Sequence, residues 1–600
     1  MYVIATAGHV DHGKSTLVKL LTGMEPDRWE QERRRGLTID LGFAWTTLPG
    51  GAEVAFVDVP GHERFVPNML AGIGPVPAVL FVVAADEGWM PQSAEHLQAL
   101  DALGVRHALL AVTRCDLADP EPARRQALGR MAATGLGPVE SVTVSGRTGE
   151  GLDRLHDGLL RLVGGLPPAD PDADVRLWAD RSFSVVGAGT VVTGTLTAGT
   201  LRRGAELQLA STGAVVRVRG LQTLGRDLPE VRAVARVAVN LRGVEHRAIG
   251  RGDALLTPGR WLMTAEVDVA LRGAGGSGSE AGERSDLPRE LVLHVGSASV
   301  SARVRPLGAG SARLRLARPL PLRVGDRALL RDPGRHRIAA GVDVLDVAPP
   351  GLSRRGAARL RAVELAALAD ASPRAVAEAM LRRRRFATAD EFQAMGLPEV
   401  GDPVGDGRRV HPGAWRESVV SLRALIDEWR DEHPLESGMP VEAVRRRLRL
   451  PAAGVVERLA GAAGLPVVEG RVCAPGSLAV LPGPVEAAVA ALTVELRAAP
   501  FAAPDAARMA ELHLGARELA AAVRAGRLLK VAEGVFLLPD GDRRAAVVLA
   551  QLPQPFTLSQ ARQALRTTRR VAVPLLELLD HRGVTERLAD GTHRVRTASA

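Results

Sequence analysis

The segment from Gly8 to Ser15 constrains this chain more than any other. It reads Gly-His-Val-Asp-His-Gly-Lys-Ser, with four residues between the first glycine and the Gly-Lys-Ser triplet. A loop of this spacing, after the apolar run Tyr2–Ala7 and before the amphipathic run Thr16–Thr22, is typical of a strand–loop–helix that cradles phosphates. Backbone N–H groups and the positive end of the helix attract phosphate oxygens. We therefore expect Lys14 to reach the outer phosphates of a nucleotide and Ser15 to hold Mg²⁺.

Two further segments predict switch loops around the same nucleotide. Asp58 directly follows the strand-like run Glu53–Val57. An acidic residue in this place can bind Mg²⁺, often through water. Gly61 can give its N–H to the terminal phosphate and move when that phosphate leaves. Thr38 lies between the two motifs, where a switch loop supplies a hydroxyl to the metal.

Composition limits the classes of protein that remain. A chain of 600 residues needs several domains, because a single core stops growing well before this length. Its two cysteines, Cys115 and Cys473, exclude a disulfide framework and a cysteine-rich zinc site, and they fit a reducing cytoplasm. No long apolar run or signal-peptide pattern is found, so we expect neither a membrane span nor secretion. The net charge of +9 favours a polyanionic partner such as RNA, with a generally basic solvated surface as the alternative.

The motifs together resemble the translational GTPases of the elongation factor Tu group. The likeness rests on Gly8–Thr16, Arg35–Ile39 and Asp58–His62. It implies that His62 orients the attacking water and that Thr38 completes the Mg²⁺ shell only in the GTP state. The expected catalytic residues are His62, Thr38 and Lys14, and the expected metal ligands are Ser15, Thr38 and Asp58. GTP and Mg²⁺ are the expected cofactors.

The base-recognition segment departs from the pattern of this group. After the apolar run Ala108–Val112 comes Thr113-Arg114-Cys115-Asp116, where the group usually has Asn-Lys-x-Asp. Asp116 keeps the carboxylate that can accept from guanine, and Arg114 can stack its plane and apolar stem on the base. Thr113 replaces an amide with a hydroxyl, so some hydrogen bonding is lost. The loop Ser145-Gly146-Arg147 resembles the last guanine loop of the group, and GTP is expected over ATP. The expected nucleotide-binding residues are Gly8, Asp11, His12, Gly13, Lys14, Ser15, Thr16, Asp58, Gly61, Thr113, Arg114, Asp116, Ser145, Gly146 and Arg147.

The remaining chain changes its pattern twice. A proline-rich linker at 167–172 predicts that an α/β P-loop domain ends near 166, giving a first domain of 1–166. Short alternating runs and glycine turns predict a β-barrel domain over 174–260 and a second over 261–350. The run Gly187–Gly194 resembles the second domain of translational GTPases. The Gly/Ser-rich stretch 272–286 predicts a flexible loop within the second barrel.

Helical segments dominate from about residue 353 to the end. A repeat of about 60 residues is visible in the last part, with Pro500-Phe501 and Pro555-Phe556 opening two of its units. Three helices followed by a two-stranded wing are the winged-helix plan. We predict four tandem α+β winged-helix units over 353–600, the last of them at about 543–600. The expected fold is therefore multidomain: an α/β GTPase domain, two β-barrels and tandem winged helices.

This combination resembles one family, the bacterial selenocysteine-specific elongation factors (SelB). His433–Pro440 is similar to its second winged-helix unit, and Phe556–Ser559 and Arg569–Glu577 are similar to its last. The resemblance implies that the GTP form carries selenocysteinyl-tRNA and that the winged helices grip an mRNA hairpin beside a UGA codon. It also implies that the ribosome triggers hydrolysis. We expect a cytoplasmic monomer with no membrane partner.

Two sets of charged residues are candidates for contacts with RNA. Residues 543–600 hold ten arginines and four acidic residues, a net charge of +6 (10 − 4). Arg566, Arg569 and Arg570 lie at the expected turn into the recognition helix, where they can bind phosphates or stack on bases. A solvated basic helix face is the alternative. Asp180 and Arg181 precede the expected first strand of the second domain, and similar proteins place such residues near the aminoacyl end. A cation there can favour a selenolate, and a surface ion pair is the alternative.

Two other functions remain open at this point. The first is another tRNA-carrying translational GTPase, such as an initiator-tRNA carrier, although those often have a cysteine-ligated zinc insert that this sequence lacks. The second is a DNA-binding regulator with a GTPase switch, because winged helices often bind DNA. The barrel pair and the Arg-Gly-Leu-Thr-Ile segment at 35–39 argue against the regulator. A UGA-containing reading frame with an adjacent hairpin in the same genome would decide between them.

Overall fold

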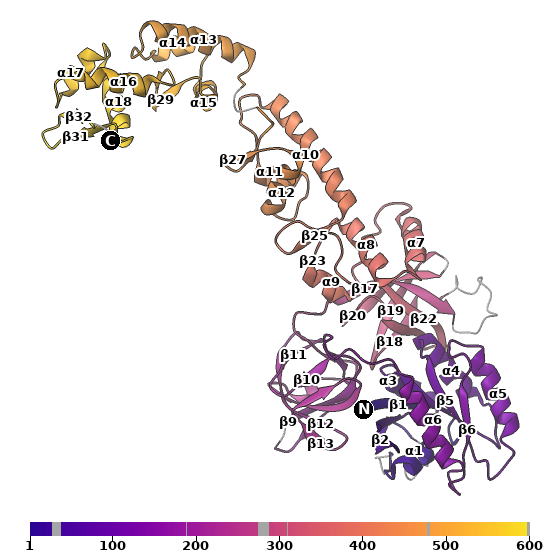
Figure 1. Cartoon of the computed structure of the whole chain (residues 1–600). Coiled ribbons are helices and arrows are strands. Elements are labelled where there is room, and N and C mark those ends of the chain that lie inside the picture. Colours follow the sequence, from indigo (N-terminus) through magenta and orange to yellow (C-terminus); the bar gives the residue numbers. More distant parts are fainter. Residues whose placement is uncertain (27–37, 188, 274–286, 309, 477–479, 597–600) are drawn as a thin grey trace. The chain divides into compact units, whose positions relative to one another are not determined.

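The computed structural model describes residues 1–600 except 27–37, 188, 274–286, 309, 477–479 and 597–600 (Figure 1). Its contacts divide the chain into two compact units. One consists of Met1–Met380 with Thr388–Val400, and the other of Leu381–Ala387 with Gly401–Ala600. Among the described residues, no helix combines the length and the apolar character needed to cross a bilayer.

The first domain is a six-stranded sheet in the order β2-β3-β1-β4-β5-β6. Its strands are β1 (Tyr2–Gly8), β2 (Gly42–Thr47), β3 (Glu53–Asp58), β4 (Ala78–Ala84), β5 (His107–Thr113) and β6 (Glu140–Thr143). All are parallel except β2, which runs antiparallel to β3. Strand β4 is buried along its whole length, as expected for a parallel strand covered on both faces.

Helices cover both faces of this sheet. They are α1 (Lys14–Thr22), α3 (Val66–Ile73), α4 (Pro91–Leu103), α5 (Glu121–Ala132) and α6 (Leu152–Gly164), with the short 3₁₀ turn η1 (Glu63–Phe65) before α3. Helix α6 buries Leu155, Leu159 and Val163, which share one face at helical spacing. The carboxyl ends of β1, β3 and β5 meet at one edge of the sheet, so the segments that follow these strands lie together there.

The second domain is an antiparallel sheet wrapped around its own core. Its strands are β7 (Arg176–Trp178), β8 (Arg181–Val185), β9 (Gly189–Leu196), β11 (Glu206–Leu209), β12 (Val215–Thr223), β13 (Arg226–Leu228), β15 (Ala235–Arg242) and β16 (Ala254–Leu256). Their order is β7-β16-β11-β12-β15-β9-β8, with β13 on β12. A separate pair is formed by β10 (Thr200–Arg202) and β14 (Glu230–Arg232), and η2 (His246–Ala248) precedes β16. In β15 buried and half-buried residues alternate, so one face points into the core.

The third domain is a closed barrel in the order β17-β20-β19-β18-β21-β22. Its strands are β17 (Met263–Gly273), β18 (Glu290–Val295), β19 (Ala298–Gly308), β20 (Ser311–Pro321), β21 (Arg327–Asp332) and β22 (Arg337–Asp346). Along β19 the residues Ala298, Val300, Ala302 and Val304 are buried and those between them are exposed. This strict alternation is the period-two pattern of a strand with one face in a core.

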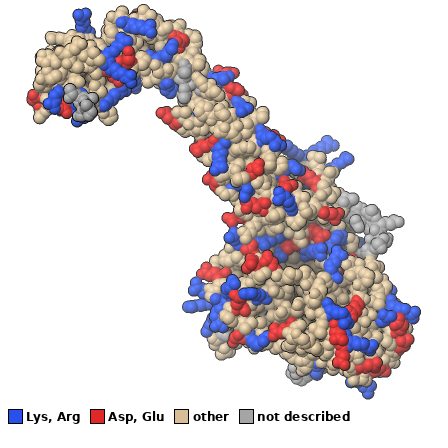
Figure 2. Space-filling view, viewed as in Figure 1, with Lys and Arg blue, Asp and Glu red and all other residues tan. Residues whose placement is uncertain are grey.

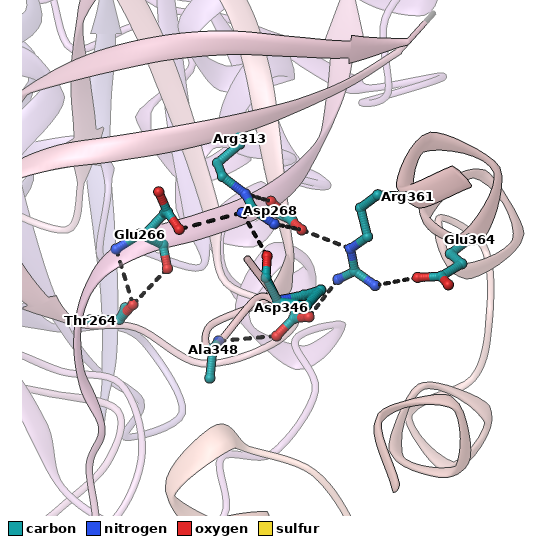
Figure 3. Close-up of polar contacts among 9 residues, drawn as sticks. Thr264, Glu266, Asp268, Arg313, Asp346, Ala348, Arg361 and Glu364 are labelled. Carbon is teal, nitrogen blue, oxygen red and sulfur yellow. Dashed lines mark hydrogen bonds and ion pairs between the residues drawn. The ribbon is translucent and has the colours of Figure 1, made fainter. Parts of the chain in front are cut away.

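A buried ion-pair network fixes α7 (Ala357–Leu368) to this barrel (Figure 3). Arg361 of α7 is 3% exposed; it donates to Asp268 of β17 at 2.8 Å and pairs with Asp346 of β22. Arg313 of β20 grips the other side of Asp268 with two hydrogen bonds of 2.6 and 3.0 Å. Burial alone would lower the pKa of Arg361, but its carboxylate partners raise it above its usual value. Helix α7 therefore belongs structurally to the third domain.

The second unit contains three repeats of three helices and a two-stranded wing among its described residues. The first of them has α10 (Pro412–Glu432), β26 (Met439–Pro440), α11 (Val441–Arg447), α12 (Ala453–Ala463), β27 (Val467–Val468) and β28 (Arg471–Val472). The next has α13 (Gly483–Ala498), α14 (Ala506–Glu511), α15 (Ala516–Arg524), β29 (Leu529–Ala532) and β30 (Val535–Leu537). The last has α16 (Gly541–Ala550), α17 (Leu558–Ala564), α18 (Arg569–His581), β31 (Thr585–Arg587) and β32 (His593–Val595). Phe501 and Phe556, which open two of the repeats in sequence, are buried in one core shared by the last two repeats.

The segment before these repeats has a shorter plan. It contains α8 (Pro373–Arg384), β23 (Phe386–Thr388), α9 (Ala389–Met395), β24 (Asp402–Pro403) and β25 (Arg408–Val410). All residues between α9 and β24 are described, and none of them is helical. This segment therefore lacks the helix that precedes the wing in the later repeats.

The predicted fold class is confirmed, and the structure corrects one local detail. A first strand, β7, comes before Asp180, and Arg181 is the first residue of β8, so this pair lies between two strands instead of preceding the first. The reason is that the three-residue β7 is too short to stand out in the sequence. Of the predicted Gly/Ser-rich loop, Arg272 and Gly273 belong to β17 and residues 274–286 lie outside the described residues. The proposed domain boundaries stay predictions.

Candidate nucleotide-binding site and adjoining pocket

The phosphate loop leaves β1 at a residue that has to be glycine. Gly8 has a φ of 132°, and a β-carbon there would lie 2.2 Å from the carbonyl oxygen of Val82 in β4. The N–H of Gly8 donates to Nδ1 of His96 in α4 at 3.0 Å. The start of the loop is therefore held between β4 and α4.

Lys14 and Gly61 lie against each other on this loop. The Lys14 ammonium donates to the carbonyl oxygens of Gly8 (3.1 Å) and His9 (2.6 Å), and the residue is 6% exposed. A β-carbon on Gly61 would lie 2.5 Å from Lys14 Nζ and 2.6 Å from the nitrogen of Val10. The segment after β3 can approach the loop this closely only because residue 61 has no side chain.

Ser15, Thr38 and Asp58 converge on one point. Ser15 Oγ donates to Asp58 Oδ2 at 2.6 Å and lies 3.0 Å from Thr38 Oγ1. The other oxygen of Asp58 accepts from the Thr6 hydroxyl at 2.7 Å, which orients the carboxylate. Neighbouring ligands in an octahedral Mg²⁺ shell with bonds of about 2.1 Å lie about 3.0 Å apart. The Ser15–Thr38 separation matches this spacing, whereas Ser15 and Asp58 lie closer because they share a hydrogen bond. The three predicted metal ligands, all hard oxygen donors of the kind that suits Mg²⁺, are thus brought together.

Thr113 and Arg114 hold the phosphate loop from the side of the base. The buried hydroxyl of Thr113 donates to the carbonyl oxygen of His12 at 2.8 Å. Arg114 bonds the carbonyl oxygen of Asp11 and pairs with Asp86 (2.9 Å) and Glu87 (2.7 Å). Burial alone would lower the pKa of Arg114, but these carboxylates raise it above its usual value. The residues that depart from the usual motif therefore tie β5 to the loop.

The last guanine loop lies beside the start of α1. A β-carbon on Gly146 would lie 3.2 Å from the methyl group of Thr16. Ser145 is fully buried, and its hydroxyl accepts from the N–H groups of Arg147 (3.2 Å) and Thr148 (3.1 Å). Gly13, with a φ of 84°, is the N-cap of α1. These positions form one rim of the site.

Two predicted residues are not brought into contact with the loop. His62 is half-buried; its Nδ1 accepts from the N–H of Arg64 at 3.2 Å, and its ring lies 5.9 Å from that of Phe65. In the neutral ring Nε2 therefore carries the hydrogen. Asp116 is exposed. Within the part of the chain that the structure describes, no hydrogen bond or ion pair joins His62 or Asp116 to the phosphate loop.

Sequence reasoning missed two features of the histidines around the loop. His96 is 1% exposed, and burial together with the charges of Lys14 and His9 lowers its pKa to about 3. Burial and the neighbouring His9 lower the pKa of His12 to about 4. No local motif marks His96, because it comes from α4 and meets Gly8 only in the folded domain.

A cavity of about 230 Å³ lies between the first and second domains. Its wall includes Phe43 of β2, Arg181 of β8 and Arg236 of β15. The guanidinium carbon of Arg236 lies 3.8 Å from the centre of the Phe43 ring and that of Arg181 lies 4.8 Å from it. Both arginines thus place a fixed positive charge beside one aromatic face.

Asp180 fixes one of these arginines. Its carboxylate accepts from both terminal nitrogens of Arg236, one at 2.8 Å, and from the Thr193 hydroxyl at 2.7 Å. Asp180 is 5% exposed and pairs with Arg236, so the alternative of a surface ion pair between Asp180 and Arg181 is not what the structure shows. Arg236 and Phe43 were missed because they lie far from Asp180 in sequence, in strands without a distinctive motif.

The three predicted RNA-binding arginines differ in their surroundings. Arg570 donates to three backbone carbonyl oxygens of the preceding repeat, those of Gly534 (3.1 Å), Ala503 (2.7 Å) and Pro504 (3.0 Å). Arg566 and Arg569 are exposed, and no side-chain hydrogen bond or ion pair is found for either among the described residues. Figure 2 shows several groups of basic side chains on the visible face of the C-terminal elements.

Four family models match separate parts of the chain. The elongation factor Tu GTP-binding domain matches residues 1–164 and elongation factor Tu domain 2 matches 189–256. The β-barrel domain of the selenocysteine-specific elongation factor matches 288–351, and the winged helix of elongation factor SelB matches 548–594.

Solved structures share the fold. The crystal structure of a bacterial selenocysteine-specific elongation factor, EF-Sec, has a TM-score of 0.77 at 24% identity, covering 99% of this chain and 100% of that one. SelB of Methanococcus maripaludis, solved with the GTP analogue GppNHp, has a TM-score of 0.50 at 24% identity, covering 57% of this chain and 78% of that one.

Curated relatives show the family. The selenocysteine-specific elongation factor of Desulfomicrobium baculatum is 37% identical over 355 residues, which are 57% of this chain and 55% of that protein. The chain therefore spans just over half of the length of that relative. The selenocysteine-specific elongation factor of Escherichia coli (strain K12) is 34% identical over 466 residues, 74% of this chain and 73% of that protein. With this coverage of both chains, and with the nucleotide site and fold described above, the chain belongs to the selenocysteine-specific elongation factors, a family of translational GTPases.

Proposed function

We propose that this protein binds GTP with Mg²⁺ and delivers selenocysteinyl-tRNA to the ribosome at UGA codons marked by an mRNA hairpin. The ribosome stimulates hydrolysis of the GTP to GDP and phosphate, and the protein acts in the cytoplasm. The observation that carries the proposal is the cavity with Arg181 and Arg236 against Phe43, between the first and second domains. Family membership supports the same function.

Residues of the first domain carry the hydrolysis. Ser15, Thr38 and Asp58 hold the Mg²⁺, which supplies positive charge to the phosphate oxygens when it is bound. Lys14 leaves the carbonyl oxygens of its own loop for the terminal phosphates, and the N–H of Gly61 donates to the same group. His62 orients the attacking water through Nε2, the ring nitrogen that is not bonded to Arg64.

The base is held by the segments after β5 and β6. The exposed Asp116 accepts from the base, and Arg114 presents its plane and stem to it. Thr113 supports the site indirectly, because its hydroxyl is engaged by the carbonyl oxygen of His12. The backbone of 145–147 closes the opposite side.

The cavity at the second domain selects the aminoacyl group by charge. A selenol ionises more readily than a thiol or an alcohol, so a selenocysteine side chain enters as an anion. Arg181 and Arg236 supply two guanidinium groups, and both lie against the ring of Phe43. A serine hydroxyl stays neutral and would gain less from the positive charge of these two side chains, which keep their own carboxylate neighbours Asp180 and Asp40.

The test compares two amino acids on one tRNA. The full chain with a non-hydrolysable GTP analogue is titrated with the same tRNA charged with selenocysteine or with serine. Two charge-assisted contacts worth about 1.5 kcal/mol each predict a preference of about 100-fold for selenocysteine. Arg236→Met removes one of the two contacts and should lower this preference to about tenfold. Arg202 is an exposed arginine of the same domain that pairs with Glu230, and Arg202→Met should keep the parental preference. Equal affinity of the parent for both charged tRNAs would refute the assignment of this cavity.

At the other end of the chain the last repeat binds the hairpin. Arg566 and Arg569 are the side chains that reach phosphates or unpaired bases, since both are exposed at the turn into α18. Arg570 contributes indirectly, because its guanidinium holds the last two repeats together.

A further inference from the structure

We propose that Arg251 is a positioning residue that couples two switch segments, the one at Thr38 and the one after Gly61, to the aminoacyl pocket, which is the cavity beside Phe43. It would hold the pocket in its binding shape only while both segments are in place. This inference rests on the proposed function, because it assigns a means by which the nucleotide state is read by the same pocket.

The side chain of Arg251 joins three separate parts of the molecule. Its Nη2 donates to Asp40 Oδ1 at 2.6 Å, two residues after Thr38. Its Nη1 donates to Asn68 Oδ1 at 2.7 Å, in the helix that follows Gly61. Its Nε donates to the backbone carbonyl oxygen of Asp180 at 2.9 Å. One guanidinium therefore contacts both switch segments and Asp180, the residue whose carboxylate holds Arg236 in the pocket wall.

The two switch segments are also joined to each other and to the pocket. The amide nitrogen of Asn68 donates to the carbonyl oxygen of Ile39 at 2.9 Å. Arg181, in the pocket wall, bonds the carbonyl oxygen of Leu41 and lies 3.7 Å from Asp40. Asp40 is thus an anion shared by two arginines of the second domain.

The base of Arg251 is fixed to the barrels and cannot follow the switches. The N–H of the next residue, Gly252, donates to the carbonyl oxygen of Ala179 at 2.9 Å. The carbonyl oxygen of Gly252 accepts from Arg318 of the third domain at 2.9 Å. A β-carbon on Gly252 would lie 2.8 Å from the α-carbon of Ala298, so this turn is tightly packed. When the switch segments withdraw, Arg251 stays behind and loses two of its three partners.

The chain of contacts begins at the metal ligands. Thr38 Oγ1 lies 3.0 Å from Ser15 Oγ, so the position of Thr38 depends on what the phosphate loop holds. A shift of Thr38 moves Asp40 with it and removes the charge that Arg251 and Arg181 share. Arg181 then loses its ion pair with Asp40, and one of the two pocket cations is held less firmly against Phe43. By linkage, a ligand in the pocket must stabilise the same arrangement of the switches.

A simpler role for Arg251 is a direct contact with RNA phosphate, since 30% of its side chain is exposed. The two roles differ in the sign expected at Asp40. Removing the Asp40 charge would leave or strengthen a direct phosphate contact, because an acidic group near an RNA backbone repels it. The same change would weaken binding in the coupling role, because the anion that holds both arginines is lost.

The experiment measures the affinity of the full chain for selenocysteinyl-tRNA with a non-hydrolysable GTP analogue and with GDP. The coupling is the dissociation constant measured with GDP divided by the dissociation constant measured with the GTP analogue. We expect Arg251→Met and Asp40→Asn each to lower this ratio about tenfold, within the range of typical coupling free energies, by weakening the GTP-analogue state. The double variant should lose no more than either single one. Arg202→Met removes an arginine of the same domain that is ion-paired with Glu230, and it should keep the parental ratio.

Three results would overturn the inference. One is that Arg251→Met and Asp40→Asn both keep the parental ratio of dissociation constants. Another is equal weakening of both nucleotide states by Arg251→Met with a reduced salt dependence, which would indicate a direct phosphate contact. The third is tighter tRNA binding by Asp40→Asn. A parent protein that binds the tRNA equally in both states would instead refute the proposed function, and the inference with it. Melting curves of the variants confirm that the fold is retained.

Discussion

The buried imidazole of His96 should make the stability of the first domain depend on pH. His96 accepts the N–H of Gly8 through Nδ1 at 3.0 Å, which requires this nitrogen to be unprotonated. Burial, together with the charges of Lys14 and His9, lowers its pKa to about 3. The start of the phosphate loop therefore depends on a neutral histidine.

The sign follows from comparing the folded and unfolded chains. In the unfolded chain a histidine has an ordinary pKa of about 6.5. Between about pH 6.5 and about pH 3 the unfolded chain binds a proton that the folded chain does not, so stability is lost as the pH falls. From about pH 7.5 to about pH 5.5, the loss due to this one residue is about 1.3 kcal/mol. Because His96 is buried, solvent does not screen this effect.

The assay is hydrogen exchange of peptides from β1 and α4 in the full chain, corrected for the intrinsic effect of pH. In His96→Gln the amide oxygen can accept the same N–H and does not titrate. The loss of stability between about pH 7.5 and about pH 5.5 should be smaller in this variant by about 1.3 kcal/mol. His156→Gln, which removes a half-exposed histidine of α6, should follow the parent. An unchanged pH dependence in His96→Gln would refute the reasoning, since His12 contributes equally to both proteins.

Three further perturbations follow from the contacts described above. Thr113→Val removes the hydroxyl that holds the carbonyl oxygen of His12, and the loosened loop should bind a fluorescent GDP analogue about tenfold more weakly; unchanged dissociation would contradict this. Arg361→Met removes the guanidinium that pairs with the buried carboxylates of Asp268 and Asp346. The free energy of unfolding of the third domain should fall by about 3–5 kcal/mol, and its calorimetric melting temperature should fall with it. Melting at the parental temperature would show that the network is not stabilising. Arg569→Glu should weaken binding of the mRNA hairpin and reduce the slope of log affinity against log salt by about one to two, as anisotropy titrations can measure; a parental slope would place the RNA elsewhere.

The sequence by itself determined the elements whose chemistry is local. The phosphate loop could be predicted because glycine spacing, Lys14 and Ser15 act within eight consecutive residues. The paired Pro-Phe positions likewise indicated the repeats, and both phenylalanines are buried. The fold class and family followed from such local signals, taken in order along the chain.

Only the tertiary structure decided which distant side chains meet. Arg236, Arg251 and His96 carry no local signal, because an arginine on a barrel strand or a histidine in a helix is usual in any sequence. Their roles arise where β2, β8 and β15 adjoin, and where α4 packs on the end of β1. The same reason separates Arg569 from Arg570: they are adjacent in sequence and both exposed, but within the described part of the chain only Arg570 bonds the backbone of the preceding repeat. Composition predicts a basic face, but the packing of neighbouring elements decides which of its charges bond to the protein itself.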